Sequence, residues 1–298
     1  MTSPRSDRLD RIAYATYVED PGRPDTDYDL PLVTDAFARR GIQLDAFAWD
    51  DAQAPWSAYP AVLVRSTWDY PLRYPDFLAW ARAVARQTRL LNPVEVVERN
   101  TDKTYLRDLE AAGVPVVPTW WYAPGETPPE PGDLAAVGPD LVVKPAVSAG
   151  ARDTLRTEDP GLAAGHVATL LANGRVAMVQ PYQHAVDSEG EYSVIVLGGE
   201  PSHVITKVPA LTEGGTGDAR GLGRLTAELA AAVRRVLAAE PLESRCAWAR
   251  VDLVRDASGE LRLMELELTE PLLFLFLAEG SADRLVDVVL DRLGASGA

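Results

Sequence analysis

The first hundred residues alternate between apolar runs and polar segments that contain glycine or proline. Residues 11–17, 42–49 and 61–65 are the apolar runs, and we expect each of them to form a β-strand. Residues 31–40 carry apolar side chains at helical spacing, and Gly41 follows as a stop signal. This strand–helix–strand order predicts an α/β fold with a parallel sheet, whose loops gather at the carboxyl ends of the strands.

A second region of regular alternation lies near the C-terminus and predicts a two-stranded hairpin. Residues 247–254 and 261–268 flank a short turn that contains Gly259. Successive side chains of a strand point to opposite faces, so the polar positions of both strands should share one face. Those positions are Arg250, Asp252, Glu265 and Glu267, and the expected core-facing set is Val251, Leu253, Met264, Leu266 and Leu268.

This hairpin concentrates negative charge. With the turn centred between residues 257 and 258, Arg250 should lie opposite Glu265, and Asp252 opposite Leu263. Like charges on one face of a sheet repel one another unless a cation lies between them. Mg²⁺ prefers oxygen ligands and is usually held by one or two carboxylates together with substrate phosphates. The alternative is an acidic sheet face on which Arg250 forms a cross-strand salt bridge.

Two polar loops near the N-terminus are candidates for binding a small substrate. The first is rich in aspartate, and the second, residues 65–70, offers a guanidinium, two hydroxyls, a carboxylate and two aromatic rings. These groups suit a small zwitterion such as an amino acid. The alternative is a surface turn with one buried tryptophan. The residues that we expect to contact a substrate are Asp27, Arg65, Thr67, Trp68 and Tyr70.

Two lysines in the middle of the chain are candidates for binding an anionic ligand, with a solvent-exposed side chain as the alternative for Lys103. Asn100 can cap a helix that has Lys103 in its first turn, where the helix dipole disfavours a cation unless an anion lies nearby. A strand over residues 141–145 carries Lys144 near its end, and the small residues 146–153 that follow could approach phosphate oxygens through their amides. The chain has neither a Walker A loop nor a Rossmann glycine fingerprint.

Three connecting segments complete the prediction. Residues 123–139 are rich in proline and should form an extended loop. A hairpin over 192–208 leads into residues 212–223, which hold too little apolar content to pack. This glycine-rich segment is either an active-site lid or a disordered connector, and only ordering on ligand binding separates the two.

Composition and charge limit the classes of function. The 298 residues leave room for two or three lobes, and a net charge of −15 argues against a general nucleic-acid binder. The single cysteine, Cys246, cannot form an internal disulfide and indicates a reducing compartment. No segment resembles a signal peptide or a membrane span, so we expect a cytoplasmic location and no membrane partner.

Taken together, these motifs resemble the ATP-grasp superfamily, and in particular its glutathione-synthetase-like branch. The resemblance covers residues 100–298, with the matching motifs in the order that the family has them. It implies an N-terminal parallel-sheet substrate domain followed by two α+β lobes that clasp ATP. The implied limits are 1–98 for the substrate domain, 99–182 for the central lobe and 183–298 for the C-terminal lobe with the metal site.

The resemblance also implies roles for individual residues. The expected nucleotide contacts are Lys103, Lys144, Ser148, Gly150, Gln180, Pro181, Tyr182, Asp187 and Glu191, with Gln180–Tyr182 at the adenine and Glu191, or its rival Asp187, at the ribose. The expected ligands of two Mg²⁺ ions, or of Mn²⁺ in their place, are Asp252, Glu265 and Glu267, and the expected catalytic cations are Lys207, Arg220 and Arg250. The chain departs from the family at Glu267, where asparagine is common, and at Tyr192–Ser193, where relatives often carry arginine.

The implied function is an ATP- and magnesium-dependent ligase. It would activate a small amino-acid carboxylate as an acyl phosphate, which a nitrogen then attacks, so catalysis consists mostly of positioning and charge neutralisation. Residues 66–70, 207–210 and 265–271 resemble a subgroup that includes cyclo-ligases converting O-ureido-D-serine to D-cycloserine in antibiotic biosynthesis. The alternatives are an intermolecular ligase that forms a dipeptide or amide, and a non-catalytic nucleotide-binding regulator. The partner would be a small molecule, and a homo-oligomer is left open.

Overall fold

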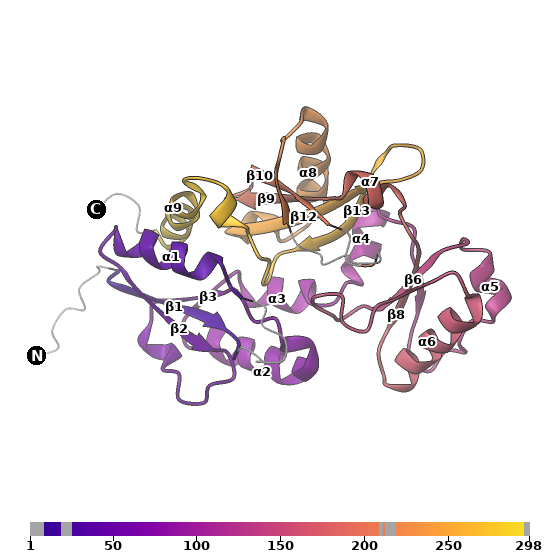
Figure 1. Cartoon of the computed structure of the whole chain (residues 1–298). Coiled ribbons are helices and arrows are strands. Elements are labelled where there is room, and N and C mark those ends of the chain that lie inside the picture. The colour runs from indigo at the N-terminus through magenta and orange to yellow at the C-terminus, as the bar shows by residue number, and fades with distance from the viewer. Residues whose placement is uncertain (1–8, 19–25, 209–210, 212–218, 295–298) are drawn as a thin grey trace, which may run out of the picture.

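The chain builds three sheets, the first of which is parallel (Figure 1). The structure, a computed structural model, describes residues 9–18, 26–208, 211 and 219–294. The first sheet has the strand order β2-β1-β3-β4, and all its neighbours are parallel, which confirms the prediction. Its elements are β1 (Arg11–Thr16), β2 (Gln43–Ala48), β3 (Ala61–Val64), β4 (Arg89–Leu91), α1 (Asp29–Ala38), α2 (Tyr74–Ala85) and the short 3-10 helices η1 (Trp56–Ala58) and η2 (Tyr70–Arg73).

Alternation along β1 explains why both faces of this sheet are covered. Ile12 and Tyr14 belong to the apolar core that includes α1, whereas Ala13 and Ala15 belong to the core that includes α2. The two polar loops follow the carboxyl ends of β1 and β3, at the same edge of the sheet.

The second sheet is antiparallel and has the order β5-β8-β6-β7. Its elements are β5 (Trp120–Tyr122), α5 (Pro131–Ala135), β6 (Leu141–Pro145), β7 (Leu155–Thr157), α6 (Pro160–Ala172) and β8 (Ala177–Pro181). Helices α5 and α6 cover the face that carries Val143 and Val179. Lys144 and Gln180 alternate with these residues and therefore lie on the other face. The expected extended loop over residues 123–139 contains α5, so that prediction is wrong in part.

The third sheet has the order β11-β10-β9-β12-β13 and holds most of the remaining core. Its strands are β9 (Glu191–Leu197), β10 (Glu200–Lys207), β11 (Ala219–Gly223), β12 (Trp248–Arg255) and β13 (Leu261–Glu267). The helices around it are α3 (Val94–Asn100), α4 (Tyr105–Ala111), α7 (Ala185–Glu189), α8 (Ala227–Ala239), α9 (Ser281–Leu293) and the 3-10 helices η3 (Glu243–Arg245) and η4 (Leu275–Leu277).

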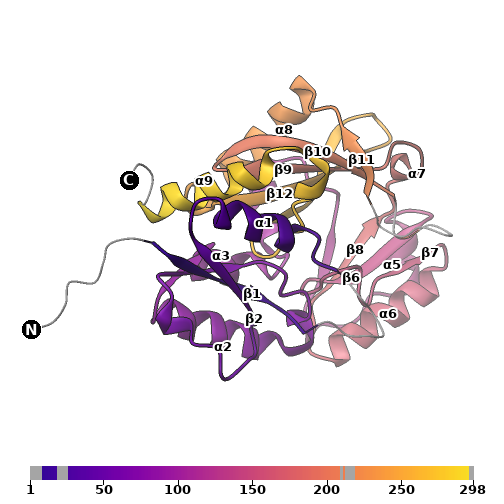
Figure 2. The same cartoon turned by 60° about the vertical axis from the view of Figure 1, so that its left-hand side comes forward.

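The two faces of the third sheet pack against different helices. One face packs on α4 and α8 through residues such as Val251 and Leu266. The opposite face begins with Trp248 and Ile195, which share a core with α9 and with α1 of the first unit. Figure 2 shows α1 and α9 side by side at this junction. We keep the limits 1–98, 99–182 and 183–298 as a proposal, although α4 packs in the core of the third sheet.

The register predicted for the β12–β13 hairpin is wrong. The observed pairs are Arg250–Glu267, Asp252–Glu265 and, after a shift of register, Leu253–Leu263. Met264 is the extra residue at this bulge, and it packs with Val254 and Tyr182 instead of joining the main core. Leu263 takes the core position that was expected for Met264.

The prediction that Asn100 caps a helix is also wrong. Asn100 is the last residue of α3, and Lys103 lies between α3 and α4. The side chain of Asn100 bonds to the free edge of β13, where Nδ2 donates to the carbonyl of Leu266 at 2.7 Å and Oδ1 accepts from the amide of Leu268 at 2.6 Å. The residue therefore holds the edge strand of the third sheet.

The glycine-rich segment 212–223 is only partly described. Its last part forms β11, which pairs with β10, so the expectation that the whole segment fails to pack is wrong there. Residues 212–218 lie outside the described residues, and a lid stays a prediction. Arg220 belongs to β11, but its side chain also lies outside the described set. None of the helices among the described residues combines the length and the apolar character that a membrane span requires.

Candidate active site

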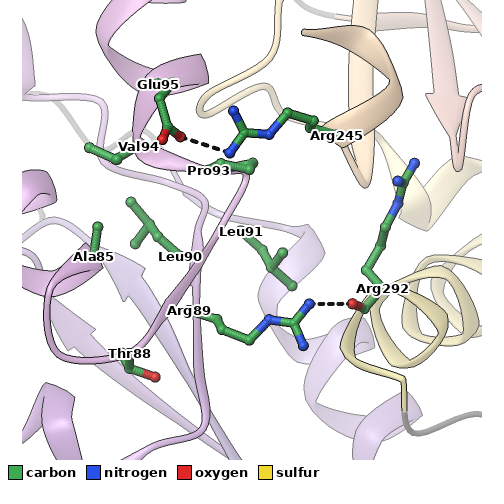
Figure 3. Close-up of a pocket in the computed structure, with 10 residues that line it drawn as sticks. All are labelled: Ala85, Thr88, Arg89, Leu90, Leu91, Pro93, Val94, Glu95, Arg245 and Arg292. Carbon is green, nitrogen blue, oxygen red and sulfur yellow. Dashed lines mark hydrogen bonds and ion pairs between the residues drawn. The ribbon is translucent and has the colours of Figure 1, made fainter.

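A cavity of about 490 Å³ lies apart from the predicted site (Figure 3). Its walls carry three arginines, but none of the predicted site residues. Arg89 donates to the carbonyls of Arg292 and Leu293, and Arg245 pairs with Glu95 at 3.0 Å. Because these guanidiniums bind the protein's own oxygens, we place the candidate active site elsewhere, on the polar part of the third sheet.

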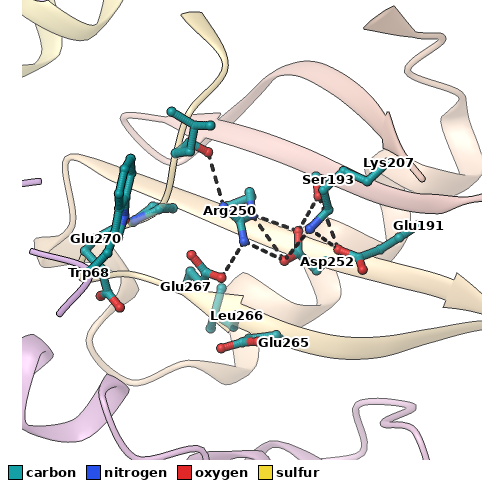
Figure 4. A network of polar contacts seen from close by, with 12 residues as sticks. Trp68, Glu191, Ser193, Lys207, Arg250, Asp252, Glu265, Leu266, Glu267 and Glu270 are labelled. Carbon is teal, nitrogen blue, oxygen red and sulfur yellow. Dashed lines mark hydrogen bonds and ion pairs between the residues drawn. The ribbon is translucent and has the colours of Figure 1, made fainter. Parts of the chain in front are cut away.

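Arg250 lies between two carboxylates on that polar face (Figure 4). Its Nε and Nη2 contact the oxygens of Asp252 at 2.9 to 3.1 Å, and Nη2 also pairs with Glu267. The cross-strand salt bridge that we considered as the alternative is therefore present. Burial alone would raise the pKa of Asp252, but Arg250 and Lys207 hold that pKa well below its ordinary value.

Lys207 approaches Asp252 from the other side. Its Nζ lies 3.5 Å from Oδ2 of Asp252 and also pairs with Glu191 at the start of β9. Ser193 of β9 pairs with Asp252 across the sheet, and its hydroxyl donates to Oδ1 at 2.6 Å. Sequence analysis gave Ser193 no role, because its importance depends on the pairing of β9 with β12. Burial raises the pKa of Glu191, although Lys207 opposes the shift.

The two predicted phosphate-binding lysines also reach this face. Lys103 is 4% exposed, and its Nζ lies 3.0 Å from Oε1 of Glu265 and donates to the carbonyl of Ser148 at 2.7 Å. Lys144 is half-buried and makes no salt bridge within the described residues. Burial lowers the pKa of Lys144, and the positive charge of Lys103 adds to the shift while Glu265 opposes it. The structure thus brings both lysines toward the hairpin carboxylates and leaves Lys144 without a partner in salt-bridge range in the described chain.

The hairpin holds more buried negative charge than its cations balance. The pKa of Glu267 is raised to about 8, chiefly by burial, with Glu265 and Asp252 adding to the shift and Arg250 opposing it. Such an excess suits a divalent cation with oxygen ligands. In this arrangement, however, no three His, Cys, Asp or Glu side chains of the described residues converge closely enough to hold a metal ion.

The predicted adenine and ribose residues form a second group beside the hairpin. Gln180 is buried and donates to the hydroxyl of Thr119 at 2.8 Å. Tyr182 packs with Val254 of β12, and its hydroxyl donates to Asp187. Asp187 therefore belongs with Tyr182, whereas Glu191 belongs with Lys207 and the carboxylates. Pro181 ends β8 between Gln180 and Tyr182, and Gly150 has the positive φ of 61° that favours glycine.

The predicted substrate residues divide into two places. Arg65 donates to the carbonyl of Pro271 at 2.9 Å, and Trp68 donates to that of Glu270 at 2.9 Å, so this loop touches the segment after β13. Tyr70 is buried beside the carboxylate of Glu270. Asp27 instead accepts from the first amides of α1 and from the hydroxyl of Tyr14.

Arg65 and Thr67 hold buried groups that lack partners. Nε and Nη1 of Arg65 and the hydroxyl of Thr67 make no hydrogen bond within the described residues. Asp29, which sequence analysis did not select, lies 3.6 Å from Arg65 and accepts from two amides of the segment after β13. Burial raises the pKa of Asp29 to about 6, with Arg65 opposing the shift. Buried unpaired donors of this kind suit an anionic ligand group.

Glu270, like Ser193 and Asp29, is a residue of the site that was not selected from the sequence. It is 8% exposed and lies three positions after Glu267, beyond the end of β13. The alternation rule did not select it, because the strand has ended by that point. Its signal in the chain was a third glutamate directly before Pro271, within the motif 265–271 that resembles the cyclo-ligase subgroup, but no role was assigned to it.

The three sheets, with Lys144 on the second and the carboxylates of Asp252, Glu265 and Glu267 on the third, define the ATP-grasp class of protein. A solved structure of the ATP-grasp ligase PsnB with a precursor variant, Mg and ADP has the same fold, with a TM-score of 0.65 at 18% identity, covering 96% of this chain and 100% of that chain. The chain belongs to the family of the D-cycloserine synthetase DcsG. It is 37% identical over 284 residues to the cycloserine biosynthesis protein DcsG of Streptomyces lavendulae, which covers 90% of this chain and 94% of the relative.

Two further comparisons agree with this assignment. The crystal structure of D-cycloserine synthetase DcsG superposes with a TM-score of 0.85 at 35% identity, covering 95% of this chain and 99% of that chain. The family model for the N-terminal domain of D-cycloserine synthetase DcsG matches residues 12–92. That span comprises the parallel sheet and both substrate loops. The relationship therefore includes the N-terminal region, which lies outside the ATP-grasp motifs of residues 100–298.

Proposed function

We propose that this protein is an ATP-dependent ligase that closes O-ureido-D-serine to D-cycloserine. The observation that carries the proposal is the 37% identity, over 90% of this chain, to a cycloserine biosynthesis protein. The site supports it because a cyclo-ligase has to bring a carboxylate and a triphosphate together, and the described cations and carboxylates gather on one sheet face. A cytoplasmic location is part of the proposal and rests on the single free cysteine.

ATP would lie between the second and third sheets. Lys103 and Lys144, together with the amides near Ser148 and Gly150, would neutralise its phosphates. Lys144 is suited to this role because it has no salt bridge in the described chain. The residues assigned to the adenine are Gln180, Pro181 and Tyr182, and the ribose contact falls to Glu191 or to its rival Asp187.

The hairpin carboxylates would hold the metal. Asp252, Glu265 and Glu267 supply only oxygen donors and lie on one face of the hairpin, so the donor set fits Mg²⁺, two ions in our assignment, or Mn²⁺. When bound, the metal would neutralise the triphosphate and polarise its γ-phosphoryl group. Glu265 and Glu267 would have to leave their present partners, Lys103 and Arg250, which are then free to face the anionic oxygens.

The chain's own cations would stabilise the charge that develops in the reaction. Arg250, Lys207 and, by position, Arg220 would face the γ-phosphate and the substrate carboxylate. A carboxylate oxygen attacks the γ-phosphorus and ADP leaves, which gives an acyl phosphate. The substrate nitrogen that is bonded to oxygen then attacks the acyl carbon. The carbon–nitrogen bond forms as the bond to phosphate breaks, phosphate leaves and the nitrogen loses its proton. Water then attacks the carbamoyl carbon, the bond from that carbon to the ring nitrogen breaks, and the carbamate that leaves decomposes to carbon dioxide and ammonia, which gives D-cycloserine.

One incubation tests this proposal against the intermolecular alternative. The protein is mixed with ATP, Mg²⁺ and O-ureido-D-serine as the sole amino acid, and ADP and product mass are followed together. We expect ADP release in step with a product that has the mass of D-cycloserine or of its carbamoylated ring. A requirement for a second amine would show an intermolecular ligase. Tight ATP binding with no ADP formed from any carboxylate would show a regulator.

A further inference from the structure

The segment after β13, residues 270–275, is fixed from several sides. Arg65, Trp68 and Arg250 donate to its carbonyls, and the carboxylate of Asp29 accepts from its amides. The bonds run from Trp68 to the carbonyl of Glu270 (2.9 Å), from Arg65 to that of Pro271 (2.9 Å), from Arg250 to that of Leu272 (3.3 Å), and from the amides of Leu273 and Leu275 to Asp29 (2.7 Å each). The backbone that carries Glu270 is therefore held rigidly at the junction of the substrate loop and the hairpin.

The carboxylate of Glu270 lacks a cation at this rigid position. The other carboxylates of the site all have a partner: Glu191 pairs with Lys207, Asp252 with Lys207 and Arg250, Glu265 with Lys103, and Glu267 with Arg250. Glu270 is 8% exposed and forms no salt bridge within the described chain. The hydroxyl of Tyr70 donates a hydrogen bond to it, and Lys103 acts on it only from beyond ion-pair distance.

A buried carboxylate without a cation is costly to the fold, and no described side chain gains a salt bridge from this one. A cationic ligand group would compensate the charge. In an α-amino acid the ammonium and the carboxylate are bonded to the same carbon, so the ammonium site must lie next to the place where the carboxylate is activated. Glu270 meets this requirement, because it follows the proposed metal ligand Glu267 by three residues and faces Trp68 and Tyr70 of the substrate loop.

We propose that Glu270 binds the α-ammonium group of the amino-acid substrate and thereby selects amino acids over plain carboxylic acids. This inference rests on the proposed function, since it names the substrate group that one further residue of the same site recognises. The unpaired donors of Arg65 and Thr67, in the same loop, are available to anionic or carbonyl oxygens of the same ligand. The competing role for Glu270 is a further metal ligand.

The test uses Glu270→Gln, which keeps the shape of the side chain and removes its charge. We expect the KM for O-ureido-D-serine to rise roughly 10- to 100-fold, as is typical for the loss of a charged hydrogen bond, while the KM for ATP and the Mg²⁺ dependence stay unchanged. Glu260→Gln, at the exposed turn of the same hairpin, is the matched control and should leave all three unchanged. Glu270→Asp should recover part of the affinity. Thermal midpoints no lower than that of the wild type show that the variants fold, and Glu270→Gln should raise the midpoint because it removes a buried charge.

A substrate without the ammonium group separates recognition from other roles. The wild type and Glu270→Gln should bind 3-(ureidooxy)propanoate, which lacks only that group, with equal affinity in calorimetry. If Glu270→Gln weakens binding of this analogue, the inference is overturned. It is also overturned if Glu270→Gln changes the Mg²⁺ dependence and leaves the KM for the amino acid unchanged.

The inference can fail separately from the proposed function. If the wild type forms no ADP with O-ureido-D-serine, the proposed function fails, and D-serine is then compared with 3-hydroxypropanoate in the same binding measurement. A preference for D-serine that Glu270→Gln abolishes supports the ammonium site. Equal affinity of the wild type for both compounds overturns it.

Discussion

Residues 115–117 bond to the outer edge of β13 through their backbone at Leu263, whereas at Leu266 this edge is completed by side chains. Removing one of these side chains should weaken both the fold and the site. The hydroxyl of Tyr105 donates to the carbonyl of Leu266 at 2.7 Å and accepts from the amide of Leu266 at 2.9 Å. Leu266 lies between Glu265 and Glu267 and is fully buried. In Tyr105→Phe the carbonyl keeps its bond from Asn100, but the amide loses its acceptor. One buried, unpaired amide and one lost hydrogen bond predict a destabilisation of about 2 kcal/mol.

Urea unfolding of the ligand-free protein measures this loss. The midpoint should fall while the slope of the free energy with urea concentration stays the same, because the surface exposed on unfolding does not change. Tyr122→Phe is the matched control, since the Tyr122 hydroxyl has no hydrogen bond within the described residues, and it should cost less than about 0.5 kcal/mol. If Tyr105→Phe costs as little as the control, the hydroxyl does not hold the edge of β13, and the reasoning is refuted.

The remaining predictions concern nucleotide binding and pH. Lys144→Met should raise the Kd for ATP at least about tenfold in calorimetry, because a cation at the phosphates is lost. The unfolding free energy should change little, because the wild-type lysine has no salt bridge in the described chain. An unchanged Kd would show that Lys144 does not bind the phosphates. Asp29 has its pKa raised to about 6 from an ordinary value of 3.8, so the folded state binds the proton more tightly than the unfolded state. The stability that this group contributes is therefore fully present below pH 4 and is lost as the pH rises through 6. Unfolding free energies of the wild type relative to Asp29→Asn should decline over that window, and a constant difference would contradict the shifted pKa.

Local pattern was enough to predict most of the elements. Apolar runs predicted β1, β2 and β3, and the alternation on both sides of Gly259 predicted β12 and β13 with their shared polar face. These predictions succeed because side chains of a strand alternate whatever the strand pairs with. The same argument correctly predicted that Arg250 and Asp252 lie on one face of the hairpin.

Long-range contacts limited the remainder of the prediction. The bulge at Met264 depends on how β13 fits its neighbours, so the turn alone gave the wrong register. Asn100 was assigned to a helix cap because its real partner, the edge of β13, lies more than 160 positions away in the sequence. Ser193 acquires its contact with Asp252 only once β9 pairs with β12.

The measurement that bears most directly on the central claim is the binding of Mn²⁺ in the presence of a non-hydrolysable ATP analogue. If Asp252 and Glu265 hold the metal, the wild type should bind two ions per chain under these conditions. Asp252→Asn and Glu265→Gln should each bind fewer ions and turn over at least about 100-fold more slowly. The circular dichroism of both variants should equal that of the wild type. Full ion binding and near-normal turnover in either variant would contradict the assignment of a metal–nucleotide site to the β12–β13 hairpin.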